Sequence, residues 1–459
     1  MKKWEKAAFA AISAALLLIP VYTMPFMGQS SAAENTEKRE LAQKPALFED
    51  GTFNTSFFEG MGNYLADHFT LRSELVAAQS ELKGLFGVSS SEDVVMGKDD
   101  WLYFDKTMPD YRGETTLSDI QAQRLQRVGE LMAEYVESHG ASFALTIVPN
   151  KASIYPEYLP YYARIPDSYR VTKPGCEGLT PLHQLNQTLQ HNDWYVDMTA
   201  ALNTEKDTQL YHKRDSHWNN LGARVGYDAL MKAVGGKAGA YADTPYIIQE
   251  VWDGDLDKLL GSSYKDEQAV WQKNFTYEYT SRYRSEEDVR ITTACAGGKG
   301  HLVMFRDSFA NALLPLLAEQ YATATFSRAL PFALDLTEIE QADTVIVEIV
   351  ERNLANLLTY APKMVAPVRQ MPTATADGRL VTAKTEKNAG YIKVSGLTEK
   401  VADRIYLAVD GVAYEACPIA EGDATIDNGF TAYLPAECAD KTITLLCEYD
   451  GVWTTLGNI

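Results

Sequence analysis

Three side chains in two short motifs have the types needed for nucleophilic catalysis: Ser308, His217 and Asp215. Ser308 comes after the apolar run 301–305 and just before a second apolar run, so we predict that it lies in a turn between a strand and a helix. Backbone N–H groups at such a turn can stabilise the oxyanion that forms when a serine attacks an acyl group. The alternative is that Ser308 merely caps the helix that follows.

A nucleophilic serine needs a general base. Asp215 and His217 are two residues apart, and such residues face the same way on an extended chain. A carboxylate beside a histidine fixes the ring's tautomer and stabilises the imidazolium. We therefore predict a triad in which Ser308 attacks, His217 takes its proton and Asp215 orients His217. Alone, the Asp-x-His spacing is equally compatible with a surface loop or a metal site.

Strand-like and helix-like runs alternate through the middle of the chain, which predicts an α/β fold with a mostly parallel sheet flanked by helices. Ligands bind such sheets at the carboxyl ends of the strands. Polar residues that follow predicted strands are Asn150, Lys151, Ser308, Arg352 and Asn353. We expect Lys151 and Asn150 to line this edge and bind acceptor hydroxyls; the alternative is a solvated loop. Asn353 or Arg352 is the candidate second donor to the oxyanion.

Composition narrows the function classes. The chain has 459 residues, a formal charge of −20 and a pI near 4.8, which argue against a nucleic-acid partner. Its five cysteines include no CxxC pair, so no structural zinc site is expected. Cys417, Cys438 and Cys447 could include one disulfide or be buried free thiols. No phosphate loop or dinucleotide motif is present, so we expect no cofactor and no metal.

The chain divides into several segments. Residues 1–33 carry lysines before a long uncharged run, which predicts a signal peptide or an uncleaved signal anchor, with cleavage favoured. Either one places the rest of the protein outside the cytoplasm. Residues 34–56 are predicted to be a linker and residues 57–366 the α/β domain, with a β-rich insertion at 241–294. Residues 374–459 are expected to form a small antiparallel β-sandwich.

The two motifs carry a family resemblance. Asp215-Ser-His217-Trp218, with Asn219 and Gly222 after it, and Arg306-Asp307-Ser308-Phe309 resemble the bacterial DHHW family. That family is similar to the alginate O-acetyltransferases of the SGNH hydrolase-like superfamily. Other similar stretches are Glu37–Leu41 with Pro45, Asp67–Arg72, Trp101-Leu102, Val148–Lys151 and Val350–Arg352. The similarity covers roughly residues 35–360.

The resemblance implies an SGNH-like catalytic domain at 57–366 with the histidine motif before the serine motif. It implies that Ser308, His217 and Asp215 are the triad, and that an asparagine such as Asn353 completes the oxyanion hole. It also implies O-acetyl transfer to, or removal from, a cell-surface polysaccharide or exopolysaccharide. A membrane-bound O-acyltransferase would be the expected partner.

Two residues depart from the family pattern. Arg306 stands where the serine motif usually begins with glycine, and we expect it to narrow the pocket or hold a carboxylate. Ser216 replaces the first of the two adjacent histidines in the family's name. On an extended chain it would point away from the site.

Three functions fit these observations. The first is an O-acetyltransferase that acts through an acyl-Ser308 intermediate. The second is a carbohydrate O-acetylesterase with the same triad, because the access of water to the acyl-enzyme decides between transfer and hydrolysis. The third is an inactive surface protein that binds glycan through the C-terminal sandwich, which could instead be a spacer or an oligomer contact.

Overall fold

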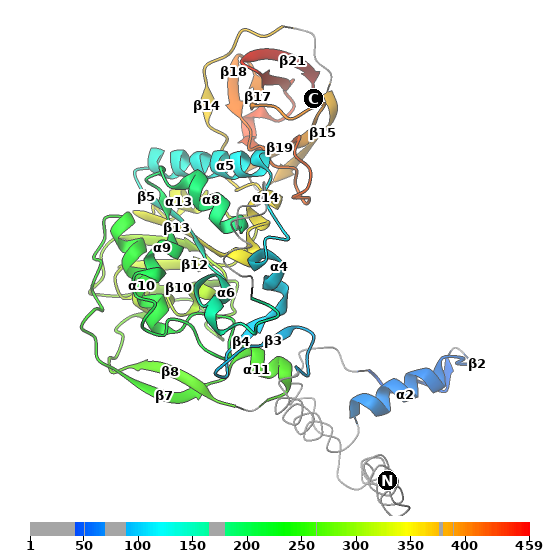
Figure 1. The fold of residues 1–459 in the computed structure, drawn as a ribbon. Coiled ribbons are helices and arrows are strands. Elements are labelled where there is room, and N and C mark those ends of the chain that lie inside the picture. Colours follow the sequence, from blue (N-terminus) through cyan, green and yellow to red (C-terminus); the bar gives the residue numbers. More distant parts are fainter. Residues whose placement is uncertain are drawn as a thin grey trace, which may run out of the picture.

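The computed structural model describes residues 42–49, 51–68, 89–164, 180–262, 264–375, 380–388 and 390–459 (Figure 1). The predicted signal segment, the first part of the predicted linker and Cys176 lie outside these ranges, as does most of the 67–72 motif. Within the ranges, no helix has the length and apolar character needed to cross a membrane.

A seven-stranded mixed sheet forms the centre of the chain. In spatial order its strands are β6 (Tyr195–Val196), β5 (Ser142–Val148), β13 (Thr344–Val350), β11 (His301–Phe305), β12 (Thr323–Ser327), β10 (Arg290–Ala294) and β9 (Glu278–Tyr279). The strands from β6 to β12 are parallel to their neighbours, whereas β10 and β9 pair antiparallel at one edge. The predicted α/β fold is confirmed, with a sheet that is mixed rather than parallel throughout.

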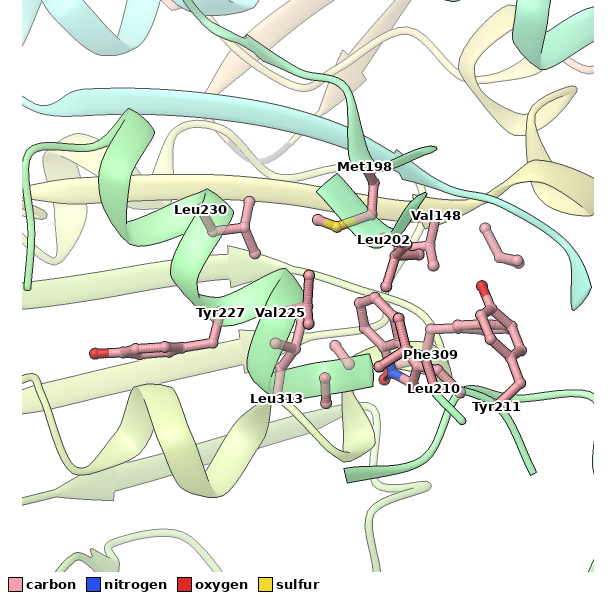
Figure 2. Packing of buried hydrophobic residues seen from close by; sticks show 14 of the residues in the cluster. Val148, Met198, Leu202, Leu210, Tyr211, Val225, Tyr227, Leu230, Phe309 and Leu313 are labelled. Atoms are coloured by element: carbon pink, nitrogen blue, oxygen red, sulfur yellow. Dashed lines mark hydrogen bonds between the residues drawn. The ribbon is translucent and has the colours of Figure 1, made fainter. Parts of the chain in front are cut away.

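Helices cover both faces of this sheet, which explains why β5 and β13 are apolar along almost their whole length. Successive residues of a strand point to opposite faces. Accordingly, Ala144 and Val148 of β5 belong to one buried cluster, and Phe143 and Leu145 belong to the other. Figure 2 shows part of the first cluster, where residues from several elements pack together beneath the serine turn.

The predicted helices form close to their expected positions. The long helix α5 begins after Ser118, whose hydroxyl accepts the N–H of Gln121 while the Gln121 side chain accepts the N–H of Ser118, a capping box. The α-helices of the described residues are α2 (Phe57–His68), α4 (Met108–Tyr111), α5 (Asp119–Ser138), α6 (Lys151–Ile154), α8 (Pro181–Leu189), α9 (Met198–Asn203), α10 (Asn220–Ala233), α11 (Asp255–Leu260), α12 (Leu314–Ala318), α13 (Leu336–Ile339) and α14 (Asn356–Thr359).

Among the described residues, three two-stranded antiparallel sheets lie beside the central sheet. The strands β1 (Phe48–Glu49) and β2 (Thr52–Phe53) form one. The strands β3 (Val94–Met96) and β4 (Leu102–Phe104) form another, and the turn between them places Asp99 and Asp100 at positive φ, which aspartate tolerates. The third joins β7 (Tyr246–Trp252) to β8 (Asp266–Trp271).

The segment 241–294, expected to be a β-rich insertion, contains the strands β7, β8, β9 and β10. Although β7 and β8 pair only with each other, β9 and β10 complete the central sheet. A run of short strands with many charges gave no sign of which sheet they would join, because strand pairing depends on residues far away in the sequence.

The C-terminal region contains two antiparallel sheets. One has the order β14 (Val368–Arg369), β18 (Val412–Glu415), β17 (Arg404–Val409), β20 (Thr444–Tyr449) and β21 (Val452–Asn458); the other has β15 (Leu380–Asn388), β16 (Tyr391–Thr398) and β19 (Gly429–Pro435). Both contribute to one buried cluster. Cys417, Cys438 and Cys447 are buried free thiols, so the disulfide alternative is wrong.

Helix α5 lies between the central sheet and the C-terminal region (Figure 1). The carboxylate of Glu415 on β18 is buried and accepts hydrogen bonds from Arg127 of α5, at 2.7 Å to each oxygen, and from Arg369 of β14 at 2.6 Å. One turn earlier, Arg124 is itself buried and donates to the carbonyl of Pro418 and to Asp427. These contacts fix the C-terminal sheets to helix α5, which packs on the central sheet.

We predict that Glu415→Gln destabilises the protein by roughly 3–5 kcal/mol, because it leaves two arginines facing each other around a neutral side chain. Glu134 also pairs with Arg369 but its side chain is 44% exposed. Glu134→Gln is therefore the matched control and should cost only about 0–1 kcal/mol. Urea denaturation measures both, and equal losses in the two variants would contradict the assignment.

Candidate active site

Ser308 lies directly after β11, where the chain enters a one-turn 3₁₀ helix, Phe309–Asn311. The α-helix that was expected at once begins only at Leu314. The Ser308 hydroxyl makes no capping hydrogen bond, so the helix-cap alternative is wrong. Instead, its Oγ lies 2.8 Å from Nε2 of His217.

His217 and Asp215 come from a loop that is closed by a bridge between Tyr211 and Trp218. Nδ1 of His217 lies 2.7 Å from Oδ1 of Asp215, which also accepts the backbone N–H of His217 at 2.9 Å. Ser308, His217 and Asp215 therefore form one continuous chain of hydrogen bonds. In this order the ring can take a proton from the serine at Nε2 while the carboxylate holds the proton on Nδ1.

The second oxygen of Asp215 is also fully used. Oδ2 accepts the indole N–H of Trp252 at 2.9 Å and the backbone N–H of Asp255 at 2.9 Å. Asp215, His217 and Asp255 lie close enough together to hold a cation. However, a cation at Asp215 would have to displace N–H donors that already point at both oxygens. This donor set favours the triad over the metal alternative.

Ser216 does not point away from the site, contrary to expectation. Its N–H and hydroxyl both donate to Asp255, at 2.7 and 2.5 Å, and its Oγ lies 3.3 Å from Nδ1 of His217. The bends of the loop replace the extended conformation that the expectation assumed. Asp255 itself is brought in by Gly254, where a Cβ would lie 2.2 Å from the carbonyl oxygen of Arg214.

The charges around the ring set its proton affinity. Burial raises the pKa of Asp215, but hydrogen bonding to His217 and its positive charge outweigh burial, so the net pKa is low and the carboxylate stays ionised. Burial lowers the pKa of His217, but Asp215 and then Asp255 outweigh this effect and raise it above the usual value. Burial and the neighbouring Asp215 raise the pKa of Asp255. The ring is thus a stronger base than a free histidine.

Trp218 and Phe309, the last residues of the two motifs, join the two halves of the site. The indole N–H of Trp218 donates to the carbonyl of Phe309 at 2.8 Å. The Phe309 ring packs against His217, with centroids 4.7 Å apart, and against Trp218. Both side chains are buried in the cluster of Figure 2. The aromatic residues of the motifs therefore hold the base and the serine turn at a fixed separation.

Asp307 fixes the other side of the serine turn. Its Oδ1 accepts the N–H of Phe309, and its Oδ2 accepts the N–H of Val350 and the side-chain amide of Asn353. The N–H of Asp307 in turn donates to Glu348, a buried residue of β13. Asn353 is therefore engaged with the aspartate of the motif. This contact positions the turn. The amide has a second N–H, so its expected role as an oxyanion donor stays a prediction.

Two other groups near the serine turn are candidate hydrogen-bond donors to an oxyanion: the backbone N–H of Ser308 and the guanidinium of Arg352. No described residue accepts a hydrogen bond from the backbone N–H of Ser308. The guanidinium of Arg352 lies over the Phe309 ring, 5.2 Å from its centroid, and is close enough to His217 to oppose the rise in the pKa of that ring. Of the two side chains considered for this role, Arg352 is thus the one that faces the catalytic groups.

Lys151 does not bind as expected. It is buried, and its ammonium donates to the carbonyls of His212, Lys213 and Asp215 at 3.0, 2.8 and 2.6 Å. All three of its N–H donors are used, so it anchors the loop that carries His217 rather than an acceptor hydroxyl. Burial lowers the pKa of Lys151 to about 7. Asn150 is also buried and its backbone N–H donates to Glu351, but its side-chain amide has no partner among the described residues, so its expected role in binding a hydroxyl stays a prediction.

Arg306 is buried in structural contacts. Its guanidinium donates to the carbonyl of Glu286 at 2.6 Å and to the side chain of Asn311 at 2.6 Å. It thus ties the loop before β10 to the serine turn. Neither expected role, narrowing the pocket or binding a carboxylate of a ligand, is supported by these contacts.

Sequence reasoning missed Asp255 and Trp252, which both contact Asp215. They lie in the segment interpreted as an insertion, about forty residues after the Asp-x-His motif. The one available signal was Asp253-Gly254-Asp255, where glycine permits close backbone approach. That signal does not indicate which distant loop is approached.

The site has the geometry of a serine–histidine–aspartate hydrolase, built on an α/β sheet with the serine at the carboxyl end of a central strand. Residues 94–293 match the family model described as SGNH hydrolase-like domain, acetyltransferase AlgX. The match includes Asp215 and His217 and ends before Ser308. The expected resemblance to the alginate O-acetyltransferases is therefore confirmed, over a shorter stretch than the motifs suggested.

Two curated relatives are both named probable alginate O-acetylase AlgJ. The one from Pseudomonas putida is 28% identical over 179 residues, covering 36% of this chain and 42% of the relative. The one from Pseudomonas syringae is 29% identical over 175 residues, covering 36% of this chain and 41% of the relative. The chain thus matches less than half the length of either relative.

Solved structures that resemble the chain include a DHHW family protein from Eubacterium siraeum, with 16% identity and a TM-score of 0.39. That match covers 52% of this chain and 86% of the other. The O-acetyltransferase domain of Pseudomonas putida AlgJ has 18% identity and a TM-score of 0.35, covering 57% of this chain and 91% of that domain.

The second carboxylate, Asp255, generates a prediction about pH. Ester turnover needs neutral His217, so activity should rise with pH through the pKa of that ring. Replacing Asp255 with asparagine removes one of the negative charges that raise this pKa. The acid limb of the kcat/KM profile should therefore move to lower pH in Asp255→Asn.

The matched comparison is Asp215→Asn, in which the orienting carboxylate itself is lost and activity should fall by roughly 10⁴-fold. Asp255→Asn should retain far more activity than this on the alkaline plateau. An unmoved acid limb in Asp255→Asn would mean that Asp255 serves only to hold the loop.

Proposed function

We propose that the protein is an extracytoplasmic, serine-dependent O-acetyltransferase that modifies a cell-surface polysaccharide or exopolysaccharide through an acetyl-Ser308 intermediate. The observation that carries this proposal is the hydrogen-bonded chain from Ser308 Oγ through His217 to Asp215, at 2.8 and 2.7 Å. An inactive binding protein would have no need to keep a buried carboxylate, an imidazole and a hydroxyl in this order.

In the first half-reaction, Ser308 Oγ attacks the carbonyl carbon of an acetyl donor while Nε2 of His217 takes the hydroxyl proton. The carboxylate of Asp215 stabilises the imidazolium. In this proposal the Ser308 N–H and the Arg352 guanidinium, which lies over the Phe309 ring beside the serine, stabilise the oxyanion. Collapse of the tetrahedral intermediate breaks the bond to the donor's leaving group, which receives the proton from His217, and leaves acetyl-Ser308.

In the second half-reaction, a sugar hydroxyl takes the place of the leaving group. His217 accepts its proton as the sugar oxygen attacks the acetyl carbonyl, and the proton then returns to Ser308 as the ester bond to the enzyme breaks. The product is an O-acetylated sugar and the free enzyme. No metal or cofactor takes part in either step.

Hydrolysis is the second candidate, and one observation favours it. The His217 side chain is 21% exposed, so water can reach the base unless a bound glycan covers it. With water in place of the sugar hydroxyl, the same steps release acetate and make the protein a carbohydrate O-acetylesterase.

The N-terminal lysines and the uncharged run that follows them support a location outside the cytoplasm. Residues 57–366 would form the catalytic domain there, either secreted or held at the membrane by residues 1–33. An acetyl donor on that side of the membrane must be delivered through it. A membrane-bound O-acyltransferase is therefore the proposed partner.

The test uses an activated acetyl ester with purified protein, with and without oligosaccharide. We predict that wild-type protein releases the leaving group and that Ser308→Ala lowers this rate by roughly 10⁴-fold or more, because the nucleophile is lost. O-acetylated sugar detected by mass spectrometry identifies a transferase, and acetate alone identifies an esterase.

Ser327→Ala is a suitable control, because Ser327 is also a buried serine at the end of a strand of the same sheet and lies outside the triad. It should retain wild-type turnover. Equal turnover by Ser308→Ala and wild-type protein, with both folded by circular dichroism, would overturn the enzymatic proposal.

A further inference from the structure

A cavity of about 320 Å³ lies beside the catalytic loop and has no part in the triad. Aromatic side chains of Trp101, Tyr155 and Tyr158 line it together with polar side chains of the loop and of the β3–β4 turn. A concave site with an aromatic surface and a few polar groups is the usual form of a small-molecule site.

The aromatic part of the cavity is rigid. Tyr158 stacks on Trp101 with ring centroids 4.5 Å apart and planes 1° apart, and Tyr155 lies 4.8 Å from Trp101. Trp101 and Tyr155 are buried, whereas Tyr158 is partly exposed. On the inner side, the Lys151 ammonium lies 5.6 Å from the Trp101 ring. Fixed rings of this kind present a flat surface to a sugar at little cost in conformational entropy.

Several polar side chains that line the cavity have no partner within the described part of the protein. Among the described residues, none makes a hydrogen bond or ion pair with the side chains of Asp99, Asp207, Gln209 or Lys213. These groups offer both acceptors and donors, as the hydroxyls of a sugar require. The lining contains two lysines, Lys206 and Lys213, and two aspartates, so its formal charges cancel.

The cavity is joined to the triad through the same loop. Lys213 lines the cavity, and Asp215 orients the base two residues later. The ammonium of Lys151 binds the carbonyls of both residues. The cavity and the base are therefore formed in part by one loop, which Lys151 fixes at both residues.

Charge argues against an anionic polymer. The cavity has no excess of positive charge, the carboxylates of Asp215 and Asp255 both lie beside His217, and the whole chain has a formal charge of −20. A polyuronate such as the one in the names of the curated relatives would be repelled over this surface.

We propose that the cavity is a subsite for a neutral sugar unit of the acceptor polysaccharide, which stacks on Tyr158 and bonds to Gln209, Lys213 and the two aspartates. This inference rests on the proposed function, because it names the acceptor class of the same site. According to this inference, the protein binds a neutral, hydroxyl-rich glycan and not a polyuronate.

The test measures binding to Ser308→Ala protein by isothermal titration calorimetry, so that no turnover intervenes. The probes are neutral tetrasaccharides of glucose and of N-acetylglucosamine in β-1,4 and α-1,4 linkage, and tetrasaccharides of uronic acids. At least one neutral probe should bind, and more tightly than any uronate. Adding Tyr158→Ala should weaken that binding by roughly tenfold or more, because the stacking surface is lost.

Tyr161→Ala is the matched control, because Tyr161 is a neighbouring tyrosine that is 87% exposed and does not line the cavity. A second variant, Asp207→Lys, alters only an exposed side chain and should improve uronate binding by making the cavity cationic. The subsite is overturned if no neutral probe binds, if Tyr158→Ala binds as Tyr161→Ala does, or if uronates bind best. The ester assay needs no glycan. Failure of the binding test would therefore overturn the subsite without contradicting the proposed chemistry at Ser308.

Discussion

Burying the carboxylate of Asp215 is costly unless its lone pairs are matched by donors, and the chain supplies those donors from separate segments. Two come from His217, and two come from Trp252 at the end of β7 and Asp255 at the start of α11. The backbone carbonyl of the same residue is held by Lys151 from the end of β5. Each element that packs around the site is thereby fixed relative to the base.

The serine turn depends on a similar arrangement on the opposite side. Asp307 binds the end of β13 through Val350 and Asn353, and Trp218 binds the carbonyl of Phe309. The base and the nucleophile are therefore positioned by contacts between their own motifs. This explains why the residues beside Ser308 and His217 have specific types: they carry hydrogen bonds and ring contacts that set the distance of 2.8 Å between Oγ and Nε2.

The sequence was sufficient to predict which three side chains the structure joins by hydrogen bonds, and most of the α/β elements, because residue type, spacing and hydrophobic period are local properties. It could not predict the partners of Lys151 and Arg306. A charged residue at a strand end is usually solvated, and only the folded chain shows that backbone carbonyls surround these two. Asp255 was missed for the same reason, since its contact with the triad depends on a distant loop.

The negative charge around His217 bears on which acceptor we propose, because the curated relatives are named for alginate, an anionic polysaccharide. Asp255 adds a second carboxylate beside His217, which favours the protonated ring and disfavours an anionic acceptor. The neutral, aromatic cavity beside Lys213 is consistent with the same preference. Under this proposal, the carboxylates beside His217 both raise the basicity of the ring and disfavour an anionic acceptor.

The most direct test of the account is to trap the covalent intermediate. Protein mixed with an activated acetyl ester in the absence of acceptor, quenched in acid and digested, should yield one acetylated peptide, with the acetyl group on Ser308. His217→Ala should accumulate far less of it, because the base is missing. Ester turnover by the wild-type protein without acetyl-Ser308 at any time point, or equal acetylation in His217→Ala, would contradict the mechanism.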